Sequence, residues 1–395
     1  MSKLQELIRE LCPNGVEYKT IRETVGVNRG KRLTKRQLSD DGKYEVYHGS
    51  KDSILGKYAE FNAPENTVII INTGGIGGVK FLDRPFWCSD GSFWLGQAKY
   101  VNPKFLYYYL SGYEDFFYSQ RRVGGVPTID RSVIEKFEIP VPPPEVQEEI
   151  VKILDHFTDL AVELQVELQA RQEQYEYYRN KLLTFSKIGG GTQGVTWMKM
   201  SEIGTFVRGK RFVRADIVNE GIPCIHYGDM YTYYGLYATQ SKGRLRRELA
   251  SKMRYAQKND VVIVAAGENK EDIGIGLAWL GDEPAAVHDA CFIFRSDLYP
   301  QYVSHYLRST YYHKQIVKYV SEGKICSISA KGLGNAIIPV PPYEEQVRIA
   351  TLLNNFDALV GDLTKGLPAE VAAVQEQYEY YRNKLLSFSR ADMSA

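Results

Sequence analysis

Two short stretches of the chain gather arginine and lysine at matching spacing. NRGKRLTKR, at residues 28–36, and VRGKRFVR, at residues 207–214, share the letters RGKR. Guanidinium and ammonium groups at this density neutralise phosphates, and arginine can also bind base edges. One basic cluster is as often a solvated surface, but the same cluster in two places favours a polyanion-binding role. The candidate residues are Arg29, Lys31, Arg32, Lys35 and Arg36 in the first stretch, and Arg208, Lys210, Arg211 and Arg214 in the second.

Histidine and tyrosine side chains follow both basic stretches and extend the candidate surface. His48 lies in the first half of the chain, and His226 and Tyr227 lie in the second. These side chains can hydrogen-bond to base edges or to the sugar–phosphate backbone. A third basic cluster, between residues 242 and 258, occurs in the second half only. From it we take Arg244 and Arg246 as further candidate contacts.

No phosphate-binding loop of the GxxxxGK[ST] type is present, which argues against a nucleotide-driven motor. TGGIGG, at residues 73–78, follows a strand-like run and is rich enough in glycine to approach a phosphate. It lacks GxGxxG spacing and a following amphipathic helix, which argues against a dinucleotide site. We expect Thr73 to begin a loop that touches nucleic-acid backbone or that forms a plain turn.

Acidic residues do not combine into a catalytic set. Glu268–Asn269–Lys270 follows Asp260 as in the acid…ExK arrangement of metal-dependent nucleases, but the spacing is short and the first half has no counterpart. We therefore keep Asn269 and Lys270 as candidate DNA contacts only. His288–Asp289 is a lone pair, which is more typical of a packed or surface histidine than of a metal ligand. We expect no catalysis, no metal site and no cofactor in this chain.

The elements that position these residues are written twice. QEQYEYYRNKLLTFS, at residues 172–186, returns as QEQYEYYRNKLLSFS at residues 375–389 with one difference. After each copy of a proline-rich leader (IPVPPPEVQ and IPVPPYEEQ), apolar residues recur at steps of three and four, which is typical of a coiled-coil helix. Core packing alone does not require identity on the polar face, so both copies are expected to meet the same partner surface. The candidate partner-binding residues are Tyr177, Arg179, Tyr380 and Arg382.

Each repeat predicts a helix of roughly 60–70 Å at 1.5 Å rise per residue. Gly366 and Pro368 fall inside the second helix, so we expect a kink there. GGGTQG, at residues 189–194, is expected to end the first helix and act as a flexible joint. Residues 145–176 hold nine acidic and two basic residues, a net charge of −7 that leaves +8 for the rest of the chain. The near-neutral total therefore hides a positive surface elsewhere.

Two segments of similar size precede the helices and contain the basic stretches. Each has a strand-like run, TVIIIN at residues 67–72 and VVIVAA at residues 261–266. Each then has one predicted helix begun by proline, PKFLYYYLSGYEDFFYSQ from Pro103 and PQYVSHYLRSTYYHKQIVKYV from Pro300. Asn102 is a plausible N-cap for the first of these helices. The five cysteines are scattered and never form a CxxC pair, and the N-terminal stretch lacks the apolar core of a signal peptide. We expect a cytoplasmic protein.

With these duplicated features, the chain resembles a specificity (S) subunit of a Type I restriction–modification enzyme over essentially its full length. The leaders, the repeated QYEYYRNKLL and the word GLPAEV at residues 366–371 support the resemblance. It implies an α+β fold in which two α/β target recognition domains alternate with two long helices that pair as an antiparallel coiled coil. The expected bounds are 1–142 and 195–341 for the recognition domains, 143–188 and 342–390 for the helical regions, and 189–194 for the linker.

The resemblance also implies partners. Each recognition domain would read one half of a split site on double-stranded DNA, and the helices would dock two methyltransferase (M) subunits, joined by motor-nuclease (R) subunits for cleavage. S-adenosylmethionine, ATP and Mg²⁺ would belong to M and R, and no membrane is involved. Two alternatives stay open: the recognition part of a catalytic methyltransferase or nuclease, and a coiled-coil scaffold without a nucleic-acid role.

Overall fold

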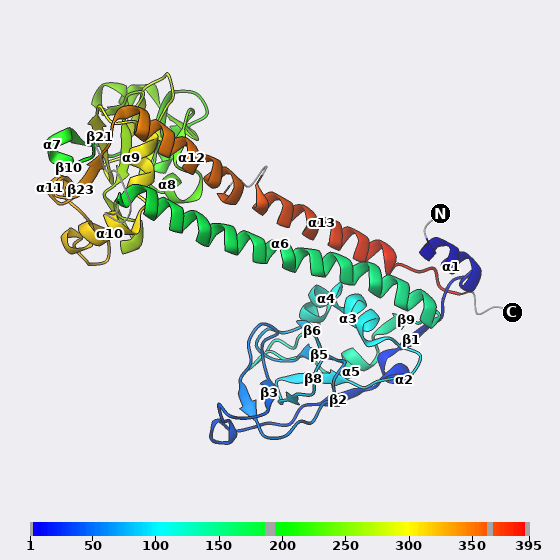
Figure 1. Cartoon of the computed structure of the whole chain (residues 1–395). Helices are drawn as coiled ribbons and strands as arrows, with labels where there is room; N and C mark the ends of the chain where they lie inside the picture. Colours follow the sequence, from blue (N-terminus) through cyan, green and yellow to red (C-terminus); the bar gives the residue numbers. More distant parts are fainter. Residues whose placement is uncertain (1–2, 186–193, 362–365, 392–395) are drawn as a thin grey trace. The chain divides into compact units, whose positions relative to one another are not determined.

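The computed structural model describes residues 3–185, 194–361 and 366–391, which belong to two compact units (Figure 1). Unit 1 comprises residues 1–165 and 370–395, and unit 2 comprises residues 166–369. The predicted joint at residues 189–194 lies outside the described residues except for Gly194. Among the described residues, no helix is both long enough and apolar enough to cross a bilayer.

Unit 1 is built on a four-stranded sheet in the order β2-β8-β5-β6 and a three-stranded sheet in the order β4-β3-β7, and β1 pairs with β9. Its strands are β1 (Tyr18–Thr20), β2 (Val27–Arg29), β3 (Tyr44–Tyr47), β4 (Gly56–Tyr58), β5 (Thr67–Ile71), β6 (Val79–Leu82), β7 (Trp87–Cys88), β8 (Ser92–Leu95) and β9 (Glu138–Pro140). Its helices are α1 (Lys3–Leu11), α2 (Ile21–Thr24), α3 (Pro103–Ser111), α4 (Glu114–Ser119) and α5 (Arg131–Glu135), with the first part of α6 (Pro144–Thr184) and most of α13 (Leu367–Leu385).

Unit 2 repeats this topology with additional strands. Its two five-stranded sheets have the orders β11-β21-β17-β19-β14 and β12-β15-β13-β20-β16, and β10 pairs with β23 and β18 with β22. The strands are β10 (Thr196–Lys199), β11 (Gly204–Arg208), β12 (Ile217–Val218), β13 (Ile222–Ile225), β14 (Tyr237–Ala238), β15 (Gly243–Leu245), β16 (Tyr255–Ala256), β17 (Val261–Val264), β18 (Ala266–Gly267), β19 (Gly276–Trp279), β20 (Ala285–Val287), β21 (Cys291–Ser296), β22 (Cys326–Ser327) and β23 (Ile337–Val340). The helices are α7 (Met200–Ile203), α8 (Asp229–Thr232), α9 (Pro300–Tyr306), α10 (Thr310–Ile316), α11 (Ala330–Gly334) and α12 (Tyr343–Gly361), with the last part of α6.

The two predicted strand runs become the centres of the main sheets. All of β5 is buried in unit 1, and all of β17 is buried in unit 2. Each receives an antiparallel neighbour on both sides, β6 and β8 in one case and β19 and β21 in the other. A strand buried on both faces needs apolar side chains throughout, which explains the unbroken runs of valine and isoleucine.

The helices begun by proline are shorter than the sequence indicates. Each predicted helix is two helices, α3 followed by α4 in unit 1 and α9 followed by α10 in unit 2. Asn102 does cap α3, because its side chain accepts hydrogen bonds from the backbone of Lys104 and Phe105. In the first pair the break falls at Gly112 and Tyr113, where glycine lowers helix propensity.

The second long helix also differs from the prediction of one kinked helix. Helix α12 ends at Gly361 and helix α13 begins at Leu367. Residues 362–365, between them, lie outside the described residues. Pro368 therefore sits in the first turn of α13, where a missing N–H has no hydrogen-bond partner to lose. The amide of Ala369 donates to the carbonyl of Gly366 at 2.9 Å in that turn.

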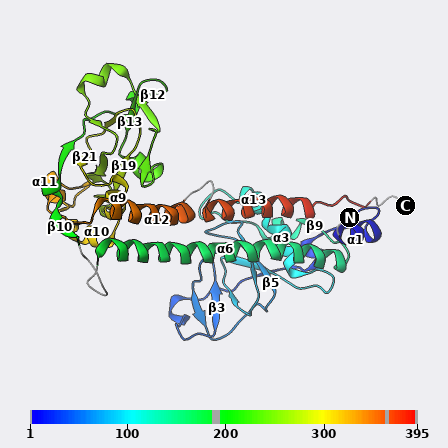
Figure 2. The same cartoon turned by 45° about the horizontal axis from the view of Figure 1, so that its top comes forward.

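Within each unit, α6 packs beside the helix from the second repeat (Figures 1 and 2). In unit 1, Phe157 of α6 stacks on Tyr381 of α13 with ring centroids 5.3 Å apart. In unit 2, Tyr178 of α6 stacks on Phe356 of α12 at 5.8 Å. Phe157 and Phe356 occupy the same position in the repeat, and so do Tyr178 and Tyr381. The two stacks are therefore equivalent, except that α6 supplies the phenylalanine in unit 1 and the tyrosine in unit 2. The predicted helical seam is thus formed by repeat-related contacts.

Candidate nucleic-acid interface

The RGKR loop of unit 1 is fixed by its backbone, which leaves its side chains outside. The amide of Gly30 donates to the carbonyl of Ser92 at 3.2 Å, and that of Lys31 donates to Cys88 at 2.9 Å. A Cβ on Gly30 would overlap the carbonyl oxygen of Ser89, so only glycine allows this approach. The five basic side chains of this stretch are all exposed: Arg29, Lys31, Arg32, Lys35 and Arg36.

The RGKR loop of unit 2 is fixed in the same way. The amide of Gly209 donates to the carbonyl of Cys291 at 3.0 Å, and that of Lys210 donates to Val287 at 2.9 Å. A Cβ on Gly209 would overlap the carbonyl oxygen of His288. Lys210, Arg211 and Arg214 are exposed, and Arg208, also exposed, donates from Nε to the carbonyl of Asp289 at 2.9 Å. The shared letters therefore specify one loop geometry twice.

In unit 1 the loop is joined by His48 and by the glycine-rich turn. The Nδ1 of His48 accepts a hydrogen bond from the amide of Gly91 at 3.1 Å and lies 3.4 Å from a carboxylate oxygen of Asp90. The amide of Gly75 donates to the carbonyl of Gly49 at 2.8 Å, which places the turn begun by Thr73 beside the residue that follows His48. The backbone of the RGKR loop, the His48 ring and the backbone of Thr73 thus all contact the turn between β7 and β8 or its ends.

In unit 2 the corresponding residues line a pocket of about 780 Å³. His226, which is 6% exposed, packs its ring 4.7 Å from that of Tyr227 and 4.8 Å from that of His288. Phe212 lies 5.2 Å from His288 across the same cluster. The pocket brings together four predicted residues, namely Arg211, Arg214, His226 and Tyr227.

Burial sets the charge state of the two histidines. Desolvation lowers the pKa of His226 below its ordinary value, and the neighbouring His288 and Arg214 lower it further while Asp229 raises it. Desolvation also lowers the pKa of His288, against the opposing effect of Asp289. Both rings are therefore neutral at neutral pH, and each has one N–H donor and one acceptor nitrogen.

Four predicted contacts of unit 2 lie outside both the RGKR loop and this pocket, and each is held by its own unit. Arg244 donates to the carbonyl of Gly221 at 2.9 Å, and Arg246 donates to that of Ala215 at 2.6 Å. Asn269 donates to the carboxylate of Asp272 at 3.0 Å. Lys270 pairs with Glu322 and lines a different pocket, of about 610 Å³. These contacts explain the residues structurally, so their DNA role stays a prediction.

The structure also brings in residues that the sequence did not single out as DNA contacts. His288, Asp289, Glu268, Phe212, Lys324 and Ile325 all line the unit 2 pocket. The loop that contains Lys324 and Ile325 reaches it because β18 pairs with β22, so Gly267 lies opposite Cys326. The signal for His288 was present in the sequence as the pair His288–Asp289, at the repeat position of Ser89–Asp90.

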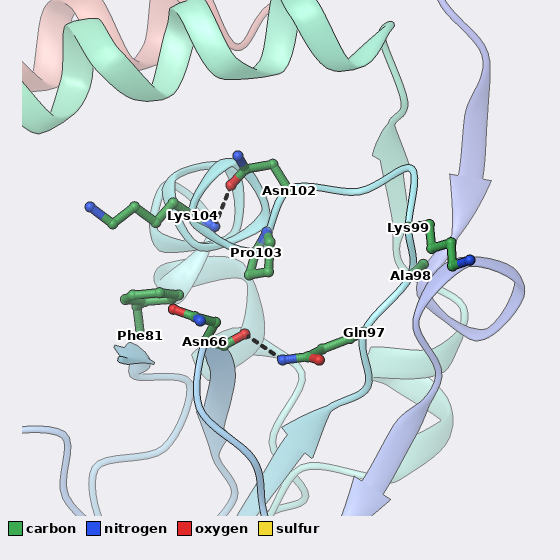
Figure 3. Close-up of a pocket in the computed structure, with 8 residues that line it drawn as sticks. All are labelled: Asn66, Phe81, Gln97, Ala98, Lys99, Asn102, Pro103 and Lys104. Carbon is green, nitrogen blue, oxygen red and sulfur yellow. Dashed lines mark hydrogen bonds between the residues drawn. The ribbon is translucent and has the colours of Figure 1, made fainter. Parts of the chain in front are cut away.

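A further pocket of unit 1, of about 560 Å³, lies at the start of α3 (Figure 3). Its walls include Asn66, Phe81 and the capping residue Asn102. Gln97 donates to the carbonyl of Asn66 at 3.2 Å, and the ammonium group of Lys104 forms an ion pair with the carboxylate of Asp155 at 2.7 Å. None of the predicted DNA contacts lines this pocket, so it is not part of the candidate interface at the RGKR loops.

The model of the Type I restriction modification DNA specificity domain family matches residues 13–174 and 193–373. The chain belongs to this family. A Haemophilus influenzae protein named as a type I restriction enzyme specificity subunit is 28% identical over 393 residues, which cover 95% of this chain and 96% of that protein. The EcoR124I/EcoR124II specificity subunit of Escherichia coli is 32% identical over 271 residues, 65% of this chain and 64% of that protein. The crystal structure of the S subunit from M. genitalium has the same fold, with a TM-score of 0.60, 18% identity and coverage of 94% and 96%.

The helical residues proposed for partner binding divide into two kinds in this specificity-family chain. Tyr177 and Tyr380 are 58% and 59% exposed. Arg179 and Arg382 instead face their own units, with guanidinium groups 5.1 Å and 5.6 Å from the ring centres of Tyr175 and Tyr378. Internal packing therefore accounts for the two arginines, and the two exposed tyrosines are the stronger candidates for a docking surface.

Proposed function

We propose that this chain is the DNA-sequence-recognition subunit of a type I restriction–modification complex, and that each unit contacts one half of a bipartite site on double-stranded DNA. The observation that supports this is the RGKR loop, which is held by the same backbone hydrogen bonds in two units while the residues around it differ. One backbone geometry suits the phosphates, which are alike at every sequence. The differing surroundings suit two different sets of bases.

The exposed lysines and arginines of the loops are proposed to contact phosphates. Their side chains are exposed, although Arg208 also donates to the carbonyl of Asp289, and they lie in loops next to side chains that can address base edges. His48 and Thr73 in unit 1, and His226 and Tyr227 in unit 2, are proposed to contact bases or sugar–phosphate. Arg244, Arg246, Asn269 and Lys270 are proposed as peripheral contacts, because each is already held by its own unit.

Two methyltransferase subunits are proposed to dock on repeat-related helical surfaces. Tyr177 and Tyr380 are nearly equally exposed, and each has a lysine ammonium about as far from its ring, Lys181 at 5.5 Å and Lys384 at 5.4 Å. Two identical exposed patches on one chain suit two copies of one partner. The complex would methylate adenine and, with motor-nuclease subunits, cleave unmodified DNA.

We assign no chemical step to this chain itself. S-adenosylmethionine, ATP and Mg²⁺ are proposed to bind the methyltransferase and motor-nuclease subunits. A cytoplasmic location is proposed as well, because all five cysteines are buried free thiols, as expected in a reducing compartment.

The test is to express the chain with its methyltransferase subunits in a host that lacks them and to sequence the methylated positions of the host DNA. We expect one bipartite motif with a fixed spacer. Exchange of residues 192–338 for those of another family member should change one half of the motif and leave the other intact. A purified chain that takes up S-adenosylmethionine by itself, or nicks DNA when a divalent metal is added, would instead favour a catalytic protein.

A further inference from the structure

The wall of the unit 2 pocket contains a hydrogen-bond donor that has no acceptor among the described residues. The Nδ1 of His226 accepts from the amide of Gly228 at 3.2 Å, so the proton of the neutral ring is on Nε2. No described residue accepts a hydrogen bond from this Nε2–H, and Nε2 is not among the fully buried polar atoms that lack a partner, so it is accessible from the pocket that His226 lines. A donor that is accessible from a pocket and has no acceptor in the protein can pair with a ligand that supplies one.

The ring of His226 is held rigidly for such a ligand. His288 lies 4.8 Å from it and Phe212 6.0 Å from it. His288 is itself fixed, because its Nδ1 accepts from the amide of Ala290 at 3.1 Å. The rotation of His226 that would aim Nε2 elsewhere is therefore opposed by two packed rings and by its own hydrogen bond to Gly228.

The charges of the pocket distinguish between two kinds of acceptor. Arg211, Arg214 and Lys324 are exposed cations that can neutralise phosphates outside. Glu268 and Asp289 line the same pocket and place carboxylates near the histidines, which disfavours the entry of a charged phosphate oxygen. Purine N7, guanine O6 and thymine O4 are uncharged acceptors on the major-groove edges of bases.

We propose that His226 reads one base of the half-site contacted by unit 2, by donating a hydrogen bond from Nε2 to an acceptor on the base edge, and that His288 is the residue that positions it. This inference rests on the proposed function. In unit 1 the repeat-related His48 has a different setting, since its side chain is 38% exposed and Ser89 stands where unit 2 has His288. A histidine at the same repeat position, packed against different neighbours in the two units, would thus contact a different base in each half-site.

The experiment uses the chain in complex with its methyltransferase subunits and a pool of DNA duplexes randomised in the half-site read by unit 2. His226→Asn and His226→Gln form a matched pair, because glutamine can place an N–H near the position of Nε2 and asparagine cannot reach it. His288→Ser removes the positioning ring, and His288→Phe keeps a ring of similar size. Lys210→Ala is the control for a phosphate contact. Thermal unfolding of each complex verifies that the variants are folded.

The proposal predicts that His226→Asn lowers the preference at one base pair about tenfold, the size expected for one neutral hydrogen bond. His226→Gln should retain part of it. His288→Ser should relax the same base pair, His288→Phe should largely restore it, and the other half-site should not change. Lys210→Ala should weaken all sequences alike and reduce the salt dependence.

Two outcomes would overturn the proposal while leaving the proposed function in place. One is an unchanged base preference in His226→Asn. The other is a weakening of all sequences alike, which would mean that Nε2 meets a phosphate. Failure of the unaltered complex to select any sequence would instead refute the proposed function itself, so the two failures are distinguishable. If His226→Asn is unfolded, the pair His288→Ser and His288→Phe still tests whether this ring cluster sets one base.

Discussion

The junction between recognition domain and helix is built twice, with the same frame and different polar side chains. In unit 1, Gln147 accepts from the amide of Asn102 at 2.8 Å, and in unit 2, Gln346 accepts from that of Tyr299 at 2.9 Å. Each glutamine also donates to a carbonyl of its proline-rich leader. One amide satisfies backbone groups at two places, and no other side chain of this length both donates and accepts in this way.

Beside this common frame, the polar contacts diverge. In unit 1, Tyr108 donates to Asp155 at 2.6 Å. At the same repeat positions in unit 2, His305 lies with Nε2 2.8 Å from Asn354, and the hydroxyl of Tyr175 lies 3.3 Å from its Nδ1. Backbone-directed contacts are thus kept letter for letter, whereas side-chain pairs change together. A pair can be exchanged for another pair if both partners change, but a backbone carbonyl has no such freedom.

Backbone contacts are also kept where the chain enters each recognition domain. Gly15 and Gly194 have φ values of +89° and +90°, and a valine follows each. In unit 1 the amide of Val16 donates to Ser389 at 2.9 Å, and the amide of Ala391 donates to Val16 at 2.9 Å. Gly15 thus lies next to the end of the second helical repeat through the hydrogen bonds of Val16. Gly194 lies just after the end of the first helical repeat through the chain itself.

The largest effect is expected from the glycine of the RGKR loop. Gly209→Ala would force a Cβ into the carbonyl of His288, and we expect a loss of about 3 kcal/mol in the free energy of unfolding, with loss of binding to the unit 2 half-site. Gly30→Ala should do the same for unit 1. Denaturant unfolding and DNA binding measure both. Gly235→Ala is the control, because no atom lies within 4 Å of the added Cβ. A tolerated Gly30→Ala beside a damaging Gly209→Ala would break the equivalence of the loops.

The second-largest effect is expected from acid, which should lower the stability of unit 2 more than that of unit 1. Four of the six histidines, His226, His288, His305 and His313, lie in unit 2, and burial lowers the pKa of each. For His305 the pKa falls from 6.5 to about 4. The unfolded chain then binds the proton first, so stability present above pH 6.5 is lost as pH falls toward 4, by about 3 kcal/mol for this residue alone.

His305→Gln isolates this contribution, because the glutamine amide stands near the position of Nε2, which lies 2.8 Å from Asn354, and does not titrate. Denaturant unfolding at pH 7.5, 6 and 5 should show a smaller loss for the variant than for the parent chain. Parallel pH curves for the two would mean that His305 is not a buried neutral ring.

The docking surfaces give the third comparison. Tyr177→Ala should weaken the binding of one methyltransferase subunit by about 2 kcal/mol. This is the size typical of a tyrosine that becomes buried at the centre of an interface. Tyr380→Ala should weaken the other to the same extent. Native mass spectrometry at limiting concentration would show complexes with one methyltransferase subunit in each case. Retention of two subunits by both folded variants would contradict the shared surface.

Much of this architecture was predictable because repeats reveal equivalence without a structure. The duplicated leaders, the strand runs and the shared RGKR all fall at matching places in the two units. The helix breaks after Ser111 and Tyr306 were not predictable from apolar period alone, since α3 and α9 are largely buried and show little amphipathic pattern.

The site was only half predictable, for a physical reason. Basic residues on one loop are near one another along the chain, so the sequence shows them. His288 and Lys324 reach the same pocket through strand pairing and loop closure, which no local pattern encodes. Arg179 is the opposite case: its identity between repeats predicts a shared surface, and the structure adds an internal contact, because its guanidinium lies 5.1 Å from the centre of the Tyr175 ring.

The smallest expected effect concerns the stacked pairs of the helices. Phe157–Tyr381 and Tyr178–Phe356 have interplanar angles of 20° and 24°, so they should have nearly equal interaction energies. Stacked aromatic pairs contribute about 1 kcal/mol beyond the area they bury. Double-mutant cycles to leucine, measured by denaturant unfolding of the full chain, give each coupling energy free of the lost area. Leucine keeps the helix propensity and most of the apolar volume, so the coupling term reports ring-on-ring contact alone. Equal couplings would show that the exchange of the two helices leaves the contact unchanged, as the repeat requires. A clear difference would mean that the neighbours on α3 and α9, which differ at Tyr108 and His305, alter the stack as well.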